Sequence, residues 1–255
     1  MAENDSNNPY QVPATDVLAA RREAPFSDTP RAVPAGNGVQ WIADAWALFK
    51  QSPGGMILLV VIYMVLNMVT GFIPLLNFVS PIINMVFLGG AFIAIRRLDT
   101  EGELKIEDLF SAFKTHLTPL LLLGLLMIGV MVVIVVVVMA LGMGTMMSSN
   151  GDPSAASLVL FVFVVLLGLA LFFLLYFTVF YSVLLIVLGN QELGPALSNA
   201  FASFMKNWLP FLVNGILALL ITAVALIPFG LGLLVSGPVL FASMYTSYKD
   251  IFAAE

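Results

Sequence analysis

The chain contains no cysteine and only one histidine, and charged residues make up just 10% of its 255 positions. The lack of cysteine excludes disulfides, thiol nucleophiles and cysteine-based metal sites. The net charge of −5 gives no basic field that would attract nucleic acid. A soluble domain carries about 25% charged residues, so this scarcity of charge indicates a protein whose solvent is lipid.

Apolar residues make up 60% of the chain and gather in long runs. Runs of roughly 20 residues are long enough to cross a hydrocarbon core of ~30 Å as a helix. The fourth run could be divided into two spans, but both would be too short for the core, so we favour one long helix. The sequence therefore predicts an all-α, polytopic membrane bundle with six spans at about 54–73, 81–95, 119–147, 155–188, 210–227 and 233–248.

Three shorter segments have apolar residues at helical spacing on one face, which is typical of amphipathic helices that lie in the membrane interface. Each comes before a pair of spans. Tryptophan and tyrosine favour the headgroup level, and the predicted interfacial anchors are Trp41, Trp46, Trp208 and Tyr248. The three apolar stripes are Ile42, Ala45, Trp46 and Phe49; Ile106, Leu109, Phe110, Phe113 and Leu117; and Leu197, Ala200, Phe201, Phe204 and Trp208.

The first 37 residues differ from the rest of the chain. They hold five prolines and few large apolar residues, so they cannot bury enough apolar surface to fold alone. We predict a disordered cytoplasmic tail at 1–37 and a six-span membrane domain at 38–255.

The positions of the cations predict the topology. With six spans, all ten lysines and arginines lie on one side of the membrane, and the opposite loops carry only Asp152. The positive-inside rule makes the cation-bearing side cytoplasmic, so both ends of the chain are predicted there. The cations are Arg21, Arg22, Arg31, Lys50, Arg96, Arg97, Lys105, Lys114, Lys206 and Lys249.

A short pattern recurs along the chain. Phe110, Phe113, Pro119 and Gly124 return at a constant offset as Phe201, Phe204, Pro210 and Gly215. Trp46 and Phe49 precede the first span as Phe201 and Phe204 precede the fifth. The pattern predicts three units in the same orientation, at about 39–95, 106–189 and 196–252, each an interfacial helix followed by a two-span hairpin. Parallel repeats of this kind occur in transporters, but also wherever a hairpin has been duplicated.

Several local motifs carry a family resemblance. They are Trp208-Leu209-Pro210-Phe211, Ile227-Pro228-Phe229-Gly230-Leu231-Gly232 and the ending Tyr245-Thr246-Ser247-Tyr248-Lys249-Asp250-Ile251-Phe252. With them, the chain after Val39 resembles an uncharacterised family of proteobacterial inner-membrane proteins known only by a locus-tag name. It is more distantly similar to YciC-like proteins and to the membrane domain found beside some glycerophosphodiester phosphodiesterases. The resemblance implies a fold and a bacterial inner-membrane location, and it transfers no active site.

The predicted spans contain no aspartate, glutamate, lysine, arginine or histidine, and their polar residues include Asn67, Thr70, Asn84 and Asn214. These four side chains either line a narrow passage or form hydrogen bonds between helices. We predict no catalytic, cofactor or metal site, and the lipid bilayer as the main partner. The favoured function is a non-enzymatic organising, assembly or regulatory component of the membrane, together with a membrane-protein partner that the sequence does not identify. The alternative is a channel or transporter for small neutral or lipid-like molecules.

Overall fold

The computed structural model describes residues 26–72, 80–147 and 155–253, and the regular structure in these ranges is entirely helical. This confirms the all-α prediction. Five helices are long and apolar enough to cross a membrane, so the chain is a multi-pass membrane protein. The long helices are α2 (Asn37–Gln51), α3 (Pro53–Phe72), α5 (Ser80–Glu101), α7 (Leu117–Met147), α8 (Ala155–Val187), α9 (Leu193–Leu226) and α10 (Leu233–Ile251).

The helix ends lie close to the predicted ones, with three differences. The helix α5 continues through Arg96 and Arg97 to Glu101. The second amphipathic segment is a short 3-10 helix, η1 (Ile106–Phe110), followed by a single turn, α6 (Ala112–Thr115). The third amphipathic helix and the fifth predicted span form one helix, α9, with non-helical backbone at Asn207. Pro210 lacks the N–H that would bond to the Lys206 carbonyl, which explains a kink at this place.

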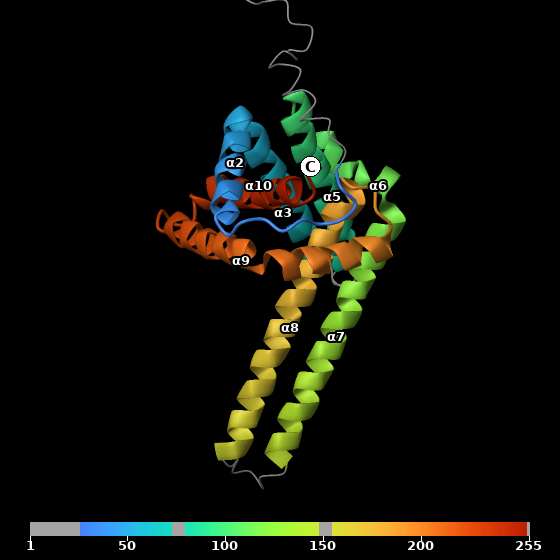
Figure 1. Cartoon of the computed structure of the whole chain (residues 1–255), viewed down its shortest axis with the longest axis vertical. Helices are drawn as coiled ribbons and strands as arrows, with labels where there is room; N and C mark the ends of the chain where they lie inside the picture. The colour runs from blue at the N-terminus through green and yellow to red at the C-terminus, as the bar shows by residue number, and fades with distance from the viewer. Residues whose placement is uncertain (1–25, 73–79, 148–154, 254–255) are drawn as a thin grey trace, which may run out of the picture.

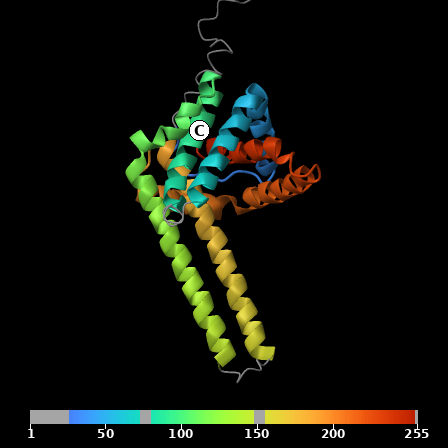
Figure 2. The ribbon, with the colours of Figure 1, turned by 180° about the vertical axis from the view of Figure 1, so that it is seen from behind.

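The three hairpins do not all run in the same direction. The pairs α3–α5 and α7–α8 have their connected ends on the same side, whereas α9 and α10 lie across them (Figures 1 and 2). The α7–α8 hairpin projects well beyond the other helices. We call residues 125–147 and 155–177 the arm, and the remaining described residues the body.

The core of the body forms where α5, α10 and the last turns of α8 meet. The largest side chains there are almost fully buried, among them Phe92, Tyr181 and Tyr245. The rings of Phe92 and Phe241 stack with centroids 4.5 Å apart and an interplanar angle of 12°. Helix α8 enters this core only at its end, because its buried residues begin at Thr178.

Each amphipathic element packs on the second long helix of the preceding hairpin: η1 on α5, α9 on α8, and α2 on α10. The packing of α2 on the last helix closes the series into a ring. Trp46, Phe110 and Phe201 point outward from these elements, with exposed fractions of 44%, 46% and 45%. Phe49 and Phe113, three residues further on, pack on the core, and Phe204 packs on the ring of Phe177 with centroids 5.1 Å apart. An outward aromatic residue and then an inward one therefore recur in all three elements.

Two glycines allow the amphipathic elements to approach their neighbours closely. A Cβ atom at Gly90 of α5 would overlap the backbone carbonyl of Leu109 in η1. A Cβ atom at Gly38 of α2 would overlap the carbonyl oxygen of Pro210 in α9. At the second crossing, the side-chain amide of Asn214 donates to the Gly38 carbonyl at 3.1 Å. Larger residues at either glycine would push the two elements apart.

Candidate functional site

The ends of α5, α8 and α10 meet in a polar cluster at one end of the body. The Arg96 guanidinium donates to the carbonyl oxygen of Leu188, which follows α8, at 3.2 Å. On α10, the Tyr245 hydroxyl donates to the Asp99 carboxylate at 2.9 Å, and the Lys249 ammonium pairs with the same carboxylate oxygen. These contacts join the three central helices directly through polar side chains.

Asp250 is the most connected side chain of this cluster. One carboxylate oxygen accepts from the Asn37 amide at 2.7 Å and from the Trp41 indole N–H at 2.8 Å. The other pairs with the Arg31 guanidinium at 3.0 Å. Asp250 therefore binds the end of α10 to the start of α2 and to the segment before it.

That segment, residues 26–36, differs from its prediction as part of a disordered tail. Its backbone N–H groups at Ser27 and Arg31 donate to the carbonyls of Phe252 and Ile251 at 2.8 and 3.0 Å. We call these residues the strap. The tail prediction was based on low apolar content. The strap is instead held by hydrogen bonds to distant residues, and amino-acid composition does not predict such bonds. Residues 1–25 of the predicted tail lie outside the described residues.

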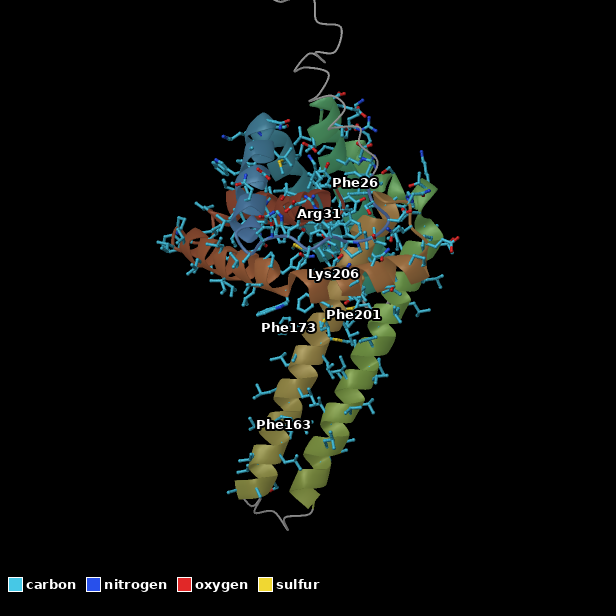
Figure 3. All side chains as sticks on the ribbon, in the orientation of Figure 1. Phe26, Arg31, Phe163, Phe173, Phe201 and Lys206 are labelled. Carbon is cyan, nitrogen blue, oxygen red and sulfur yellow. The ribbon has the colours of Figure 1, made fainter. Side chains whose placement is uncertain are left out.

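Asn207, at the kink of α9, holds the middle of the strap. Its side-chain oxygen accepts from the Val33 N–H at 2.8 Å, and its amide donates to the Arg31 carbonyl at 2.9 Å. The Lys206 ammonium donates to the Pro30 carbonyl at 2.9 Å (Figure 3 labels Arg31 and Lys206). Asn207 is completely buried, so the kink and the strap depend on each other.

A further ion pair attaches η1 to α5. Arg97 pairs with Asp108, whose side chain is only 10% exposed, and also contacts Glu101 on its own helix. Within the described part of the chain, no three histidine, cysteine or acidic side chains gather as a metal site would require. In the polar cluster the two most central carboxylates, Asp99 and Asp250, are each neutralised by a cation and by neutral donors. Such an arrangement fixes helix ends in place.

Three of the four predicted intramembrane polar residues are linked by hydrogen bonds around Tyr63, whereas Asn214 lies at a different crossing. Asn67 donates to the Tyr63 carbonyl at 2.8 Å, and Thr70 donates to the Asn67 carbonyl at 2.9 Å, both within α3. Asn84 of α5 accepts from the Tyr63 hydroxyl, which joins α3 to α5. Asn214 lies on α9 at the crossing with α2. Each side chain therefore has a hydrogen bond within its own helix or with one neighbouring element.

Two of the four predicted interfacial anchors are buried. Trp41 and Tyr248 are each 1% exposed, so neither ring is accessible to lipid headgroups. Trp46 and Trp208 are exposed and remain candidates. The buried face of α2 contains Trp41, Ala45, Leu48 and Phe49, rather than the predicted stripe with Ile42 and Trp46. The predicted stripe assumed one lipid-facing side, whereas α2 packs against both α9 and α10.

Sequence reasoning missed Asp250, Asn207 and the outward aromatic pair Phe110 and Phe201. The last two were assigned to apolar stripes, and their place at the same register as Trp46 was the available signal. No local signal identified Asp250, because its partners lie more than 200 positions away. Comparisons with protein families, with curated proteins and with solved structures find no match to this chain.

Proposed function

We propose that the protein is an integral component of the bacterial inner membrane that organises, assembles or regulates a partner membrane protein without catalysing a reaction. In this proposal six helices span the membrane: α3, α5, α7, α8, the part of α9 from Pro210 onward, and α10. Both ends of the chain are cytoplasmic. The resemblance of the motifs after Val39 to those of proteobacterial inner-membrane proteins supports the same location.

The placement of the described cations supports this orientation. Arg96, Lys249 and Arg97 lie in or beside the polar cluster, at the ends of α5 and α10. The arm helices carry no charged residue between Leu125 and Gly144 or between Ala155 and Phe177. By the positive-inside rule the cluster is cytoplasmic and the arm extends through the bilayer away from it.

The observation that carries the organising role is the exposure of the arm. No described side chain of the arm is buried. Its two helices contact each other, as where Gly142 lies against Phe161, but the body surrounds only their other ends (Figure 1). Figure 3 labels two of the exposed aromatic residues, Phe163 and Phe173. The arm therefore presents a long apolar surface to whatever lies beside it in the membrane.

The length of the arm helices adds to this argument. With 31 and 33 residues, α7 and α8 are roughly 45–50 Å long at 1.5 Å per residue. A hydrocarbon core is ~30 Å thick. Tilting relieves a mismatch of this kind at modest cost, and so does packing against another helix, because packing between helices drives association in lipid. A partner helix packed beside the arm therefore covers its apolar surface and relieves the mismatch between helix length and core thickness.

Crosslinking tests the organising role. A photoreactive amino acid at Phe163 or Phe173 is expected to capture one protein partner in native membranes in stoichiometric yield. The same group at Leu184, which is fully buried, is the matched control and should capture only segments of this chain. If both arm positions yield lipid adducts alone, the organising role is rejected. Flux of neutral solutes in reconstituted vesicles that is lost in folded Asn84→Leu and Asn214→Leu variants would favour the alternative, a channel or transporter.

The third hairpin determines the number of spans, because α9 and α10 lie across the arm in the structure (Figure 1). A cysteine introduced at Phe229, which is fully exposed, should react with a membrane-impermeant maleimide from the periplasm if six helices span. Labelling only from the cytoplasmic side would reduce the number to four. Both ends of the chain stay cytoplasmic in either case, because both numbers are even.

A further inference from the structure

The body holds the strap mainly by the strap's backbone; Figure 1 shows the strap as the blue segment without a helix that leads into α2. The strap N–H groups at Ser27 and Arg31 donate to carbonyl oxygens at the end of α10. The side-chain amides of Gln191 and Asn199 both donate to the Asp28 carbonyl, at 3.2 and 2.7 Å. Main-chain bonds of this kind bind an extended segment whatever most of its side chains are. We call the body residues that bond to the strap the strap site: Gln191, Asn199, Lys206, Asn207, Asp250, Ile251 and Phe252.

Two side chains of the strap add selectivity to these backbone contacts (Figure 3 labels Phe26 and Arg31). The ring of Phe26 packs on that of Tyr248, with centroids 4.9 Å apart. The Arg31 guanidinium donates both to the backbone carbonyl of Asp250 at 2.8 Å and to its carboxylate at 3.0 Å. The side chain of Asp28, between these two anchors, is exposed. The strap site therefore fits an extended segment that carries an aromatic residue and, five positions later, an arginine.

The strap contributes little apolar surface to the core. Pro30 is buried, and Phe26 and Val33 are half-buried against the core, whereas Ala32 and Pro34 are exposed. Most of the attachment therefore consists of hydrogen bonds, whose net contribution to stability is small because water replaces them when they break. Another extended segment would restore the same backbone bonds, so exchanging it for the strap changes their number little.

The helix that follows the strap is held in place independently of it. Asn37 and Trp41 of α2 bond to the carboxylate oxygen of Asp250 that the strap does not use. The close crossing at Gly38 holds α2 against α9. Between the strap and α2 lies Gly36, where an added Cβ atom would have nothing within 4 Å. The strap therefore has room to swing away at Gly36 while α2 keeps its contacts.

We propose that the strap is an autoinhibitory segment, which occupies a site for an extended cytoplasmic segment of the partner membrane protein. The incoming segment displaces the strap, bonds to the strap site through its backbone, and places an aromatic ring on Tyr248 and a guanidinium on Asp250. The assignment of this segment to the partner rests on the organising role proposed above. The strap site itself does not depend on that role.

Binding of a labelled peptide to the purified full chain tests the strap site. The peptide has the sequence of residues 26–36, and its binding in detergent is followed by fluorescence anisotropy. The wild-type protein should bind it weakly, because the tethered strap competes at an effective concentration on the order of 1 mM. Two changes in the protein loosen the strap alone: Arg31→Ala removes the ion pair with Asp250, and Val33→Pro removes the N–H donated to Asn207. Each should tighten peptide binding by about tenfold, which corresponds to about 1.4 kcal/mol.

Changes in the peptide supply the matched controls. A peptide with Arg31→Ala should bind the loosened proteins about tenfold more weakly, whereas Ala32→Lys, at an exposed position of the strap, should leave its affinity unchanged. The proposal is overturned if neither loosened protein binds the peptide saturably, or if both bind it no better than wild type does. Equal affinity of the original and Arg31→Ala peptides would overturn it as well. So would unfolding of both strap variants on size exclusion, because the strap would then be a structural element.

Crosslinking in native membranes separates this proposal from the organising role. A photoreactive amino acid at Gln191 should capture the strap of its own chain in the wild type. In the Arg31→Ala protein it should capture the same partner that Phe163 of the arm captures. If Phe163 captures a partner and Gln191 does not, the organising role stands and the autoinhibitory strap is rejected. Peptide binding together with lipid adducts alone at Phe163 would reject the organising role and, with it, the assignment of the incoming segment to that partner.

Discussion

The arm and the body are both built from apolar helices, but the side chains of the arm are exposed whereas the body has a buried core. Helices α7 and α8 are more apolar than α5, yet α5 is the most buried of the five helices long and apolar enough to cross a membrane, and α8 is the least buried. In water the most apolar segment would be the core. In lipid the chains of the solvent are as apolar as leucine, so apolarity alone does not drive helices together.

What distinguishes the body is shape and polar pairing. It contains the close crossings at Gly38 and Gly90 and the hydrogen bonds of Asp250, Asp99 and Asn207. The described part of the arm has mostly aliphatic and aromatic side chains and no charged residue. The comparison teaches that small residues and polar contacts, rather than hydropathy, decide which helices of this chain form its core.

The largest expected effect is a charge placed in the arm. Val133→Lys, at a position 61% exposed in the middle of α7, should raise the apparent free energy of insertion by about 2.5–3.5 kcal/mol, because lysine is costly at the centre of a membrane helix. Ala43→Lys, on the exposed face of α2, is the control and should insert normally. Insertion is measured by glycosylation mapping of the α7–α8 hairpin. Normal insertion of Val133→Lys would show that the arm is not surrounded by lipid, and the contrast with the body would disappear.

A methyl group added at a crossing should have the next largest effect. Gly90→Ala forces α5 and η1 apart because the new Cβ overlaps the Leu109 carbonyl. We expect a loss of about 2–3 kcal/mol of stability, as overpacking typically causes. Gly129→Ala in the arm has nothing within 4 Å of the new Cβ, so it should be neutral or stabilise α7 by up to about 1 kcal/mol. Thermal unfolding in detergent, followed by size exclusion, measures both. Equal stability of the two variants would contradict the role of close approach in the body.

The smallest effect in this series concerns the polar contacts. Asp250→Ala leaves the buried indole N–H of Trp41 without an acceptor and should reduce stability by about 1–2 kcal/mol. The matched control is Asp44→Ala in α2, which removes an exposed carboxylate whose one described side-chain partner is Gln40 and should cost less than about 0.5 kcal/mol. Proteolysis of the strap, residues 26–36, should become faster in Asp250→Ala alone. An unchanged rate would show that the strap is held without Asp250.

The long helices of the fold were predictable within a few residues, because helix formation in lipid is local. Each backbone N–H must bond within its own segment, so a run of apolar residues such as 155–187 is a helix wherever it lies. The kink at Asn207 was not predicted, although Pro210 marked its place. The buried face of α2 is shifted by about one residue from the predicted one. The reason is that α2 packs against two neighbouring helices, α9 and α10, which determine the buried face more than its own apolar residues do.

The candidate site was less predictable than the fold. Asn67, Thr70, Asn84 and Asn214 were identified from their position in apolar runs. That the first three are linked through Tyr63, and that Asn214 is not, was decided by the fold. No role was predicted for Asp250, because it is a charged residue at the end of an apolar helix. Its importance comes from Arg31, Asn37 and Trp41, which folding brings from the other end of the chain.

By itself, the sequence determined the all-α class, the positions of the apolar helices and their tendency to enter a membrane. These properties depend on interactions within a single segment and between that segment and its solvent. Only the tertiary structure decided that the strap is ordered, that Trp41 and Tyr248 are buried, and that α7 and α8 extend beyond the body. Those outcomes depend on contacts between residues far apart in the chain. Because lipid is itself apolar, it does not drive any particular apolar face of a helix into the interior, as water would.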